Sequence, residues 1–285
     1  MRNFKNIAHA YQDALAPLYP TAEIKQLFLM AYTFVTGEGG TYYVLNSANE
    51  VKVPELGQFM SILEELQTGR PIQYILGVAD FYGMHLFVNE HTLIPRPETE
   101  ELVEWIVSEH QNCGQLSILD IGTGSGCIAL ALKKLLPHAR VDALDVDAGA
   151  VAVARKNAAH LDLSVSVMQA DILEWDSFMQ EIQQYHVIVS NPPYITPDEQ
   201  EAMHRNVLLF EPHHALFVEK HAPLLFYDVI AEMGKKHLLP EGNLYFEINQ
   251  YLSRETADLL DRKGYKQVTL RQDLNQVDRM MRASL

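Results

Sequence analysis

The feature that most constrains the fold is an apolar run that leads directly into a glycine-rich turn and then a helix. Ser117–Ile121 precedes Gly122-Thr123-Gly124-Ser125-Gly126, and residues 127–136 are predicted to be helical. Glycines allow a sharp turn and close approach to a ligand, while the helix N-terminus offers free N–H groups to an anion. The spacing is tighter than the G-x-G-x-x-G of dinucleotide-binding folds and favours a ligand carboxylate over a pyrophosphate. The alternative is a tight turn that binds nothing.

The same alternation continues through the C-terminal two thirds of the chain. Further strands are predicted at 141–144, 163–168, 187–189 and 244–248, with a second helix at 148–160. Near-continuous apolar strands that alternate with helices are typical of a parallel sheet covered on both faces. The segments 267–270 and 279–283 lie too close together for a helical crossover and fit an antiparallel pair at the sheet edge. We therefore expect an α/β fold with a Rossmann-like, mostly parallel sheet.

The first eighty or so residues show a helical pattern instead. Apolar residues recur at helical spacing from Phe4, which predicts a first helix. A second helix is expected from about Thr21, a candidate N-cap, to about Gly37. A third helix is expected to begin at Pro54. Asp80 to Asn89 mixes aromatic residues with a glycine and is predicted to form a hairpin. The length of 285 residues fits about two domains. We expect a helical domain over 1–79, a β-hairpin connector over 80–93 and the α/β domain over 94–285.

Composition and charge argue against several classes of function. Hydrophobic residues make up 48% and charged residues 21%, which is typical of a globular protein. With 22 Lys and Arg against 37 Asp and Glu, the net charge of −15 argues against nucleic acid, although a local basic strip would still permit it. The sequence shows no signal-peptide core and no apolar run long enough to span a membrane, so we expect a cytoplasmic protein. It also shows no metal-ligand spacing, so we expect no metal and reduced thiols at Cys113 and Cys127.

Acidic residues follow the next two predicted strands. Asp145 comes about twenty residues after the first glycine, where an acid accepts hydrogen bonds from ribose hydroxyls. Asp147 is a rival for that role, or a cap for the next helix. Asp171 either accepts from an adenine amino group, with the N–H of Ile172 meeting a ring nitrogen, or caps a turn. Together these residues predict a nucleoside-bearing ligand along the carboxyl edge of the sheet.

The most specific motif is Asn191-Pro192-Pro193-Tyr194, directly after the strand predicted at 187–189. Two prolines fix φ and remove two donors, so that carbonyl oxygens remain to accept hydrogen bonds. The carbonyl oxygens of Asn191 and Pro192 can accept both hydrogens of a planar NH2 group, and Tyr194 can cover its face. The alternative is a rigid turn at the end of a strand. The position at this strand end favours binding of a planar amino group.

The glycine loop and the Asn-Pro-Pro-Tyr tetrapeptide together resemble the S-adenosylmethionine-dependent amino methyltransferases. Residues 71–77 (PIQYILG) and 93–100 (LIPRPETE) resemble, more narrowly, the HemK-type protein-(glutamine-N5) methyltransferases that modify peptide chain release factors. Other matching segments are Phe210-Glu211-Pro212, Ala215-Leu216-Phe217, Glu247-Ile248, Asp273-Leu274 and Asp278-Arg279. The resemblance covers about residues 70–285. It departs at residues 221–224 and at Asn249, neither of which we expect to touch the chemistry.

This resemblance implies a class I methyltransferase sheet, S-adenosylmethionine as donor with S-adenosylhomocysteine as product, and a release-factor glutamine in a Gly-Gly-Gln tripeptide as acceptor. It also implies that Thr99 touches the methionine end of the donor. From the acidic balance and the separate helical domain, we expect residues 1–79 to recognise the substrate. The expected donor site is Gly122, Thr123, Gly124, Ser125, Gly126, Asp145, Asp171, Ile172, Asn191 and Thr99. The expected acceptor site is Asn191, Pro192, Pro193 and Tyr194, of which Asn191, Pro192 and Tyr194 are assigned to catalysis.

Three other functions remain open at this point. A ribosomal-protein glutamine methyltransferase would need the same site. A DNA or RNA adenine-N6 methyltransferase uses the same tetrapeptide, but the net charge and the lack of a basic recognition segment argue against it. A non-enzymatic nucleotide-binding module would not need Asn191 and its prolines. The sequence leaves open which protein is methylated and how the product proton leaves, and it favours a monomer that binds no membrane.

Overall fold

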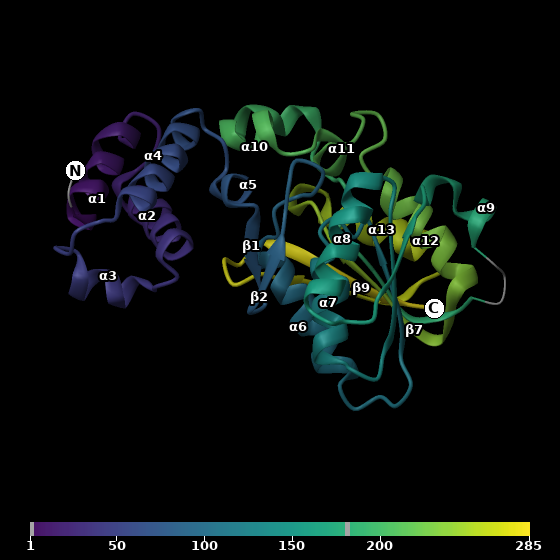
Figure 1. The fold of residues 1–285 in the computed structure, drawn as a ribbon. Helices are drawn as coiled ribbons and strands as arrows, with labels where there is room; N and C mark the ends of the chain where they lie inside the picture. Colours follow the sequence, from purple (N-terminus) through teal and green to yellow (C-terminus); the bar gives the residue numbers. More distant parts are fainter. Residues whose placement is uncertain (1–2, 180–182) are drawn as a thin grey trace. The chain divides into compact units, whose positions relative to one another are not determined.

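The computed structural model describes residues 3–179 and 183–285, which form two compact units. One unit comprises Met1–Val78 and His204–Phe210, and the other comprises Ala79–Met203 and Glu211–Leu285. Helices make up the first unit, whereas a seven-stranded sheet with helices around it makes up the second (Figure 1). No helix in these two described stretches is long and apolar enough to cross a membrane.

The helical unit is built on one apolar core. Its helices are α1 (Phe4–Leu15), α2 (Thr21–Thr36), α3 (Gly40–Asn46), α4 (Val53–Gln67), α5 (Ile72–Leu76) and α10 (Arg205–Phe210). The helical spacing predicted from Phe4 is confirmed, because Phe4, Ile7, Tyr11 and Leu15 of α1 are all buried. Tyr11 also donates its hydroxyl to the Phe59 carbonyl, which ties α1 to α4.

The predicted start at Thr21 is confirmed, the predicted start at Pro54 is shifted by one residue, and the short helices α3, α5 and α10 were not predicted. The N-cap of α2 is Pro20, which has extended backbone angles, and the Thr21 hydroxyl instead accepts a hydrogen bond from Gln12. Pro54 occupies the second position of α4 because Lys52 is its N-cap. The short helices α3 and α5 carry too few turns to show an apolar period in the sequence.

Residues 204–210 pack within the helical unit, although they follow the Asn-Pro-Pro-Tyr motif in the chain. Asn206 donates a hydrogen bond to the Tyr19 hydroxyl at 3.0 Å, and the Tyr19 and His204 rings stack 6.4 Å apart. Gly69, at a φ of 87°, lies against the Asn206 side chain, where a Cβ atom would meet Oδ1 at 3.3 Å. The chain therefore passes between the two units three times.

The sheet of the second unit has the order β5-β4-β3-β6-β7-β9-β8. Its strands are β3 (Ser117–Ile121), β4 (Arg140–Asp145), β5 (Ser166–Gln169), β6 (Tyr185–Ser190), β7 (Leu238–Glu247), β8 (Lys266–Gln272) and β9 (Asp278–Ser284). The strands β3 to β7 pair in parallel, and β9 pairs antiparallel with both β7 and β8. The predicted mostly parallel, Rossmann-like sheet with an antiparallel last strand is confirmed.

Both faces of the sheet are covered (Figure 1). On one face Ile118 packs with α6 (Pro97–His110), α7 (Cys127–Leu135) and part of α8 (Ala148–His160). On the other face Leu119 packs with α12 (Leu225–His237) and α13 (Ser253–Arg262). Neighbouring residues of β3 thus enter opposite cores, which explains why all five residues of the strand are buried. The shorter elements are η1 (Ile172–Glu174), α9 (Trp175–Phe178), η2 (Pro197–Ala202), α11 (His213–Leu216) and η3 (Gln250–Leu252).

Two predicted strands have different bounds in the structure. The strand expected at 163–168 begins only at Ser166, since Asp162 adopts a positive φ of 52° and delays it. The strand expected at 244–248 begins six residues earlier, at Leu238. Pro240, Glu241 with a φ of 67° and a glycine interrupt its pairing with β6 and hide its first half from a pattern search.

The predicted hairpin is confirmed and lies against α8. It consists of β1 (Val78–Phe81) and β2 (Met84–Phe87), joined by Tyr82 and Gly83, both at positive φ. Two positive φ values are what a two-residue hairpin turn needs. Asn157 of α8 accepts from the Phe87 N–H at 2.7 Å, and its amide donates to the carbonyls of Phe87 and Ser125 at 2.9 and 2.8 Å. This fully buried side chain therefore joins the hairpin to the glycine loop.

We predict that Asn157→Ala destabilises the second unit by about 2–4 kcal/mol, because one buried and two partly buried backbone groups lose their partner. Urea unfolding followed by circular dichroism measures this change. The matched control is Asn275→Ala, an exposed position. Equal unfolding midpoints for the two variants would show that Asn157 does not join these elements.

Candidate active site

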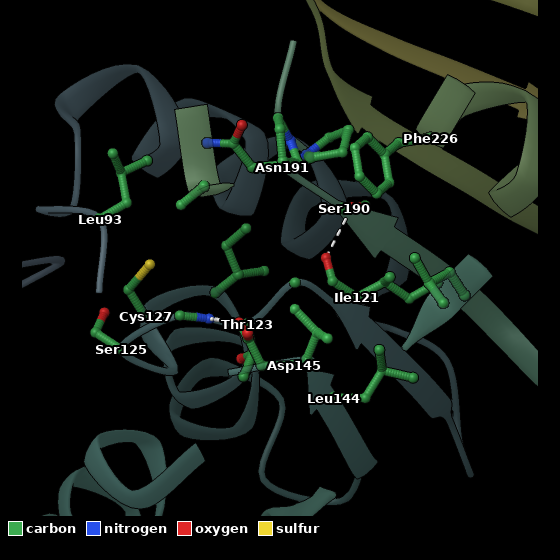
Figure 2. A pocket seen from close by; sticks show the side chains of 18 of the residues that line it. Leu93, Ile121, Thr123, Ser125, Cys127, Leu144, Asp145, Ser190, Asn191 and Phe226 are labelled. Atoms are coloured by element: carbon green, nitrogen blue, oxygen red, sulfur yellow. Dashed lines mark hydrogen bonds between the residues drawn. The ribbon is translucent and has the colours of Figure 1, made fainter. Parts of the chain in front are cut away.

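A pocket lies at the carboxyl ends of β3, β4 and β6, entirely within the second unit (Figure 2). The space between its walls, counted out to the open solvent at its mouth, is about 960 Å³. In Figure 2 Asn191 and Phe226 lie on one side of the pocket, with Asp145 and Leu144 on the other. Eleven of the thirteen predicted site residues line it: Thr99, Gly122, Thr123, Gly124, Ser125, Asp145, Asp171, Ile172, Asn191, Pro192 and Pro193. Gly126 and Tyr194 do not.

The glycine loop is fixed by the neighbouring strand. The N–H groups of Gly122 and Thr123 both donate to the Leu144 carbonyl at 2.9 Å. Gly122 and Gly124 adopt positive φ, so a side chain at either position would be strained even though there is open space for it. Gly126 has a different role, because a Cβ atom there would approach Leu130 to 3.1 Å. It permits close helix packing beneath the pocket.

Asp145 presents a carboxylate that is held in place by two backbone donors. The N–H of Gly124 donates to one oxygen at 2.8 Å, and the N–H of Asp147 donates to the other at 3.0 Å. Burial raises the pKa of Asp145, and these two hydrogen bonds oppose that rise. Each carboxylate oxygen of Asp145 keeps lone pairs that can accept from the two neighbouring hydroxyls of a ribose.

Asp147 caps α8 by accepting from the N–H groups of Gly149 and Ala150, so the alternative of a helix cap is confirmed for it.

Asp171 and Ile172 form the next part of the wall. Asp171 caps η1 by accepting from the Leu173 N–H at 2.9 Å, which is the turn-capping alternative, but it also lines the pocket. The Ile172 N–H donates to no acceptor among residues 3–179 and 183–285. Leu144 and Phe226 add apolar surface, and the result is a slot suited to a flat ring with polar edges.

Two buried polar atoms beside the glycine loop lack a partner among the described residues. They are Oδ1 of Asp120 and Oγ of Ser125. The other Asp120 oxygen accepts from the Thr123 hydroxyl at 2.6 Å and the Ala129 N–H at 3.2 Å. Burial raises the pKa of Asp120 to about 7. Unpartnered buried groups are costly, so their position next to an open pocket fits a polar ligand in this part of the site.

The Asn-Pro-Pro-Tyr motif leaves β6 beside the glycine loop. Ser190, the last residue of β6, donates to the Ile121 carbonyl at 2.7 Å (Figure 2). The amide nitrogen of Asn191 donates to the Thr99 hydroxyl at 3.3 Å. Neither Asn191 Oδ1 nor the Pro192 carbonyl accepts a hydrogen bond from the part of the chain that the structure describes. The two oxygens that the sequence assigned to a planar NH2 group are therefore open at the pocket.

A buried acid, Glu247 at the end of β7, lies behind the motif. It accepts from the Thr99 hydroxyl at 2.6 Å and from the Tyr194 hydroxyl at 3.0 Å. Burial raises the pKa of Glu247, whereas these two bonds and the charge of Arg279 lower it. In the sequence, Glu247 stands out only as part of the match to a family. Its role depends on contacts across about 50 and 150 residues of chain, which no local pattern reveals.

Asn249 also contacts the motif. Its amide donates to the Tyr194 carbonyl at 2.9 Å and to Glu199 at 2.9 Å. Neither Asn249 nor Tyr194 lines the pocket, so the expectation that this departure from the family pattern does not touch the chemistry stays a prediction. On the same side, the Arg279 guanidinium pairs with the buried Asp273 carboxylate at 3.3 Å.

Three side chains near the pocket mouth were not predicted as site residues. Arg96 lines the pocket and pairs at 2.6 Å with the buried Glu211, which fixes the start of α11. His214 of α11 and His91 both line the pocket and lie 3.7 and 3.2 Å from Asp147. His214 is half exposed and faces the site. Within the described residues no cluster of three or more His, Cys, Asp or Glu could hold a metal ion.

Comparison with known proteins gives one family model and many curated relatives. The model of the methyltransferase small domain matches residues 99–219. The release factor glutamine methyltransferase of Flavobacterium psychrophilum is 43% identical over 98% of both chains. The enzyme of the same name from Bacteroides thetaiotaomicron is 40% identical over 96% of this chain and 97% of its own.

Solved structures show the same fold at lower identity. A methyltransferase from Pyrococcus furiosus gives a TM-score of 0.53 at 18% identity, covering 71% of this chain and 89% of its own. The catalytic domain of hMettl16 in complex with a 3′UTR hairpin gives 0.56 at 17% identity, covering 82% of each chain. These likenesses concern the fold alone, and they confirm the methyltransferase sheet that the sequence predicts.

We predict that Asp145→Ala weakens S-adenosylmethionine binding by about 1.5–3 kcal/mol, because charge-assisted hydrogen bonds to ribose hydroxyls are lost. Isothermal calorimetry measures the affinity. Asp142→Ala, three residues earlier in the same strand and outside this pocket, is the matched control and should bind like the parent. Since burial raises the pKa of Asp145, the parent should lose donor affinity on acidification at a higher pH than an exposed aspartate would. Unchanged affinity in Asp145→Ala would move the ribose role to Asp147 or remove it.

Proposed function

This chain belongs to the family of the release factor glutamine methyltransferases, and we propose that it methylates the side-chain amide nitrogen of a glutamine in a peptide chain release factor, with S-adenosylmethionine as donor. The acceptor is the glutamine of the Gly-Gly-Gln tripeptide, and the second product is S-adenosylhomocysteine. The observation that carries the proposal is the pair of open oxygens on Asn191 and Pro192 at a pocket with an open glycine loop.

On the donor side, the proposed contacts follow the strand ends. The loop Gly122 to Gly126 and the unpartnered Ser125 hydroxyl hold the amino-acid end of the donor. Asp145 accepts from the ribose hydroxyls, while Asp171 and the free N–H of Ile172 bind the edge of the adenine. The predicted contact of Thr99 with the methionine end remains a prediction. Its hydroxyl hydrogen binds Glu247 and one lone pair accepts from Asn191, which leaves the second lone pair and the methyl group for that contact.

On the acceptor side, Asn191 Oδ1 and the Pro192 carbonyl each accept one hydrogen of the glutamine NH2 group. Pro193 keeps the loop rigid, and the predicted contact of the Tyr194 ring with the amide remains a prediction. An amide nitrogen is a poor nucleophile, because its lone pair is delocalised into the carbonyl. Because the two fixed oxygens accept both amide hydrogens, they polarise the N–H bonds and raise the electron density on the nitrogen.

The donor supplies an electrophilic methyl group on a sulfonium. As the nitrogen lone pair forms the N–C bond, the S–C bond breaks and its electrons stay on sulfur. Positive charge then moves from sulfur to nitrogen, where Asn191 and Pro192 stabilise it as preorganised dipoles. Alignment of the reactants contributes a further share of up to roughly 7–11 kcal/mol in favourable systems. The surplus proton leaves to water.

The other candidate functions receive less support. A ribosomal-protein glutamine methyltransferase would use the same site, but the relatives over the whole chain carry the release-factor name. An adenine-N6 methyltransferase conflicts with the net charge of −15. We further propose that the protein acts as a cytoplasmic monomer and needs no metal, nucleic acid or membrane.

The proposal is tested by incubating the protein with methyl-labelled S-adenosylmethionine and a cell extract, followed by mass spectrometry of the labelled product. We expect label on the glutamine of a Gly-Gly-Gln tripeptide. A release factor in which that glutamine is replaced by alanine is the control and should take up no label. Label on a ribosomal protein or on nucleic acid would contradict the proposal.

We predict that Asn191→Ala lowers kcat by about 10²–10³, because one preorganised acceptor is lost in the transition state. Donor affinity should change little, since Asp145 and the glycine loop remain. Asn191→Asp keeps an oxygen in place and should retain more activity than Asn191→Ala. Single-turnover rates at saturating donor measure both variants. Turnover of Asn191→Ala within a few-fold of the parent would mean that the tetrapeptide is only a turn.

We also propose that the helical unit binds the release factor. Val44 and Leu45 of α3 are 73% and 79% exposed, which suits an apolar contact with a protein partner. Replacing both with aspartate should raise KM for an intact release factor about tenfold, while KM for a short Gly-Gly-Gln peptide stays unchanged. Leu270→Asp, an exposed leucine of β8, is the matched control. Unchanged KM for the intact partner would remove α3 from the interface.

A further inference from the structure

We propose that Thr99, held by the buried carboxylate of Glu247, fixes the Asn191 amide so that its oxygen, and not its nitrogen, faces the acceptor. Thr99 and Glu247 are then positioning residues for the proposed glutamine methylation, and the inference rests on that function. The three residues come from the start of α6, the end of β7 and the end of β6.

The three side chains form one chain of hydrogen bonds. The Thr99 hydroxyl donates to Glu247 Oε2 at 2.6 Å, and the Asn191 amide nitrogen donates to the Thr99 oxygen at 3.3 Å. Thr99 and Glu247 are each only 2% exposed, so water does not compete for these bonds. Asn191 and Thr99 both line the pocket, whereas Glu247 lies behind them.

The number of hydrogens that each side chain can donate sets the direction of donation along these hydrogen bonds. A hydroxyl has one hydrogen to donate, and that of Thr99 goes to Glu247. Burial raises the pKa of Glu247, but the Tyr194 hydroxyl, which donates to its other oxygen at 3.0 Å, and the positive charge of Arg279 oppose that rise and favour the carboxylate, which can only accept. Thr99 can therefore offer Asn191 only a lone pair. A lone pair binds the NH2 side of the amide, which leaves Oδ1 for the acceptor.

The orientation matters because the acceptor is itself an NH2 group. A flipped Asn191 would set two N–H donors against the N–H bonds of the substrate and would stabilise no positive charge on nitrogen. An asparagine side chain has similar shape in both orientations, so packing alone does not choose between them. A hydrogen-bond partner that can only accept, as the Thr99 oxygen does here, selects the orientation in which the Asn191 NH2 group faces it.

Local sequence explains why a threonine stands at this position. Pro97 begins α6, which places Thr99 in the first helical turn, and its N–H donates to the Arg96 carbonyl at 3.1 Å. A β-branched side chain has few χ1 rotamers, so the hydroxyl stays aimed at Glu247.

The test compares Thr99→Val, which removes the hydroxyl at nearly constant volume, with Thr99→Ser, which keeps it. We expect Thr99→Val to lower kcat at least tenfold with donor affinity within about threefold, and Thr99→Ser to stay within about threefold in both. Thr256→Val is the matched control for loss of a buried hydroxyl outside the site, and it should leave kcat unchanged. A kcat of Thr99→Val within threefold of the parent would overturn the inference.

A double variant separates positioning from direct action. In an Asn191→Ala background, Thr99→Val should reduce kcat by less than about twofold, because Thr99 acts only through Asn191. An equal reduction in both backgrounds would overturn the inference. It would instead support direct action of Thr99 on the donor or the acceptor.

Hydrogen exchange of the Asn191 side-chain amide, followed by NMR and assigned with Asn191→Asp, needs no methyl acceptor. We expect protection in the parent and Thr99→Ser and loss of protection in Thr99→Val. Equal protection in Thr99→Val would overturn the positioning role. Absence of release-factor methylation by the parent would instead contradict the proposed function, and the exchange measurement would still decide the role of Thr99.

Discussion

The acceptor side of the site depends on one buried carboxylate, that of Glu247. It lies at the end of β7 and receives hydroxyl hydrogens from Thr99 at the start of α6 and from Tyr194 after β6. A buried charge is tolerated only where donors surround it, and those donors must come from specific places. The hydrogen bonds to Glu247 therefore join the end of β7, the start of α6 and the segment after β6, which are far apart in the sequence. These contacts also position Asn191.

The donor side depends on the parallel sheet in a comparable way. The carbonyl of Leu144, at the end of β4, accepts from two N–H groups of the glycine loop that follows β3. Asp145, the next residue, then accepts from Gly124. Strand pairing thus fixes the position of the glycine loop relative to the Asp145 carboxylate before any ligand binds. Because the carboxyl ends of parallel strands meet at one edge, the acceptor motif after β6 reaches the same pocket.

Local patterns predict much of this arrangement. The apolar strands, the glycine turn, Asp145 and the Asn-Pro-Pro-Tyr motif are all visible as short stretches, and most lie where the sequence places them. The features that were missed are long-range. Glu247 and Asn249 act on Tyr194 from more than fifty residues away, and residues 204–210 pack in a unit formed by the start of the chain. Periodicity and turn chemistry describe neighbours in sequence, so they do not reveal partners that only the folded chain brings together.

The central claim is that Asn191 presents an oxygen to the glutamine amide. A neutron diffraction structure of the protein with S-adenosylhomocysteine and a Gly-Gly-Gln peptide tests it directly, since deuterium positions distinguish the two ends of an amide. The account predicts Asn191 Oδ1 and the Pro192 carbonyl each within about 2.7–3.2 Å of the glutamine nitrogen. It also predicts the two Asn191 deuterons on the side of Thr99. Deuterons of Asn191 directed at the glutamine, or a glutamine amide bound away from Asn191, would contradict the account.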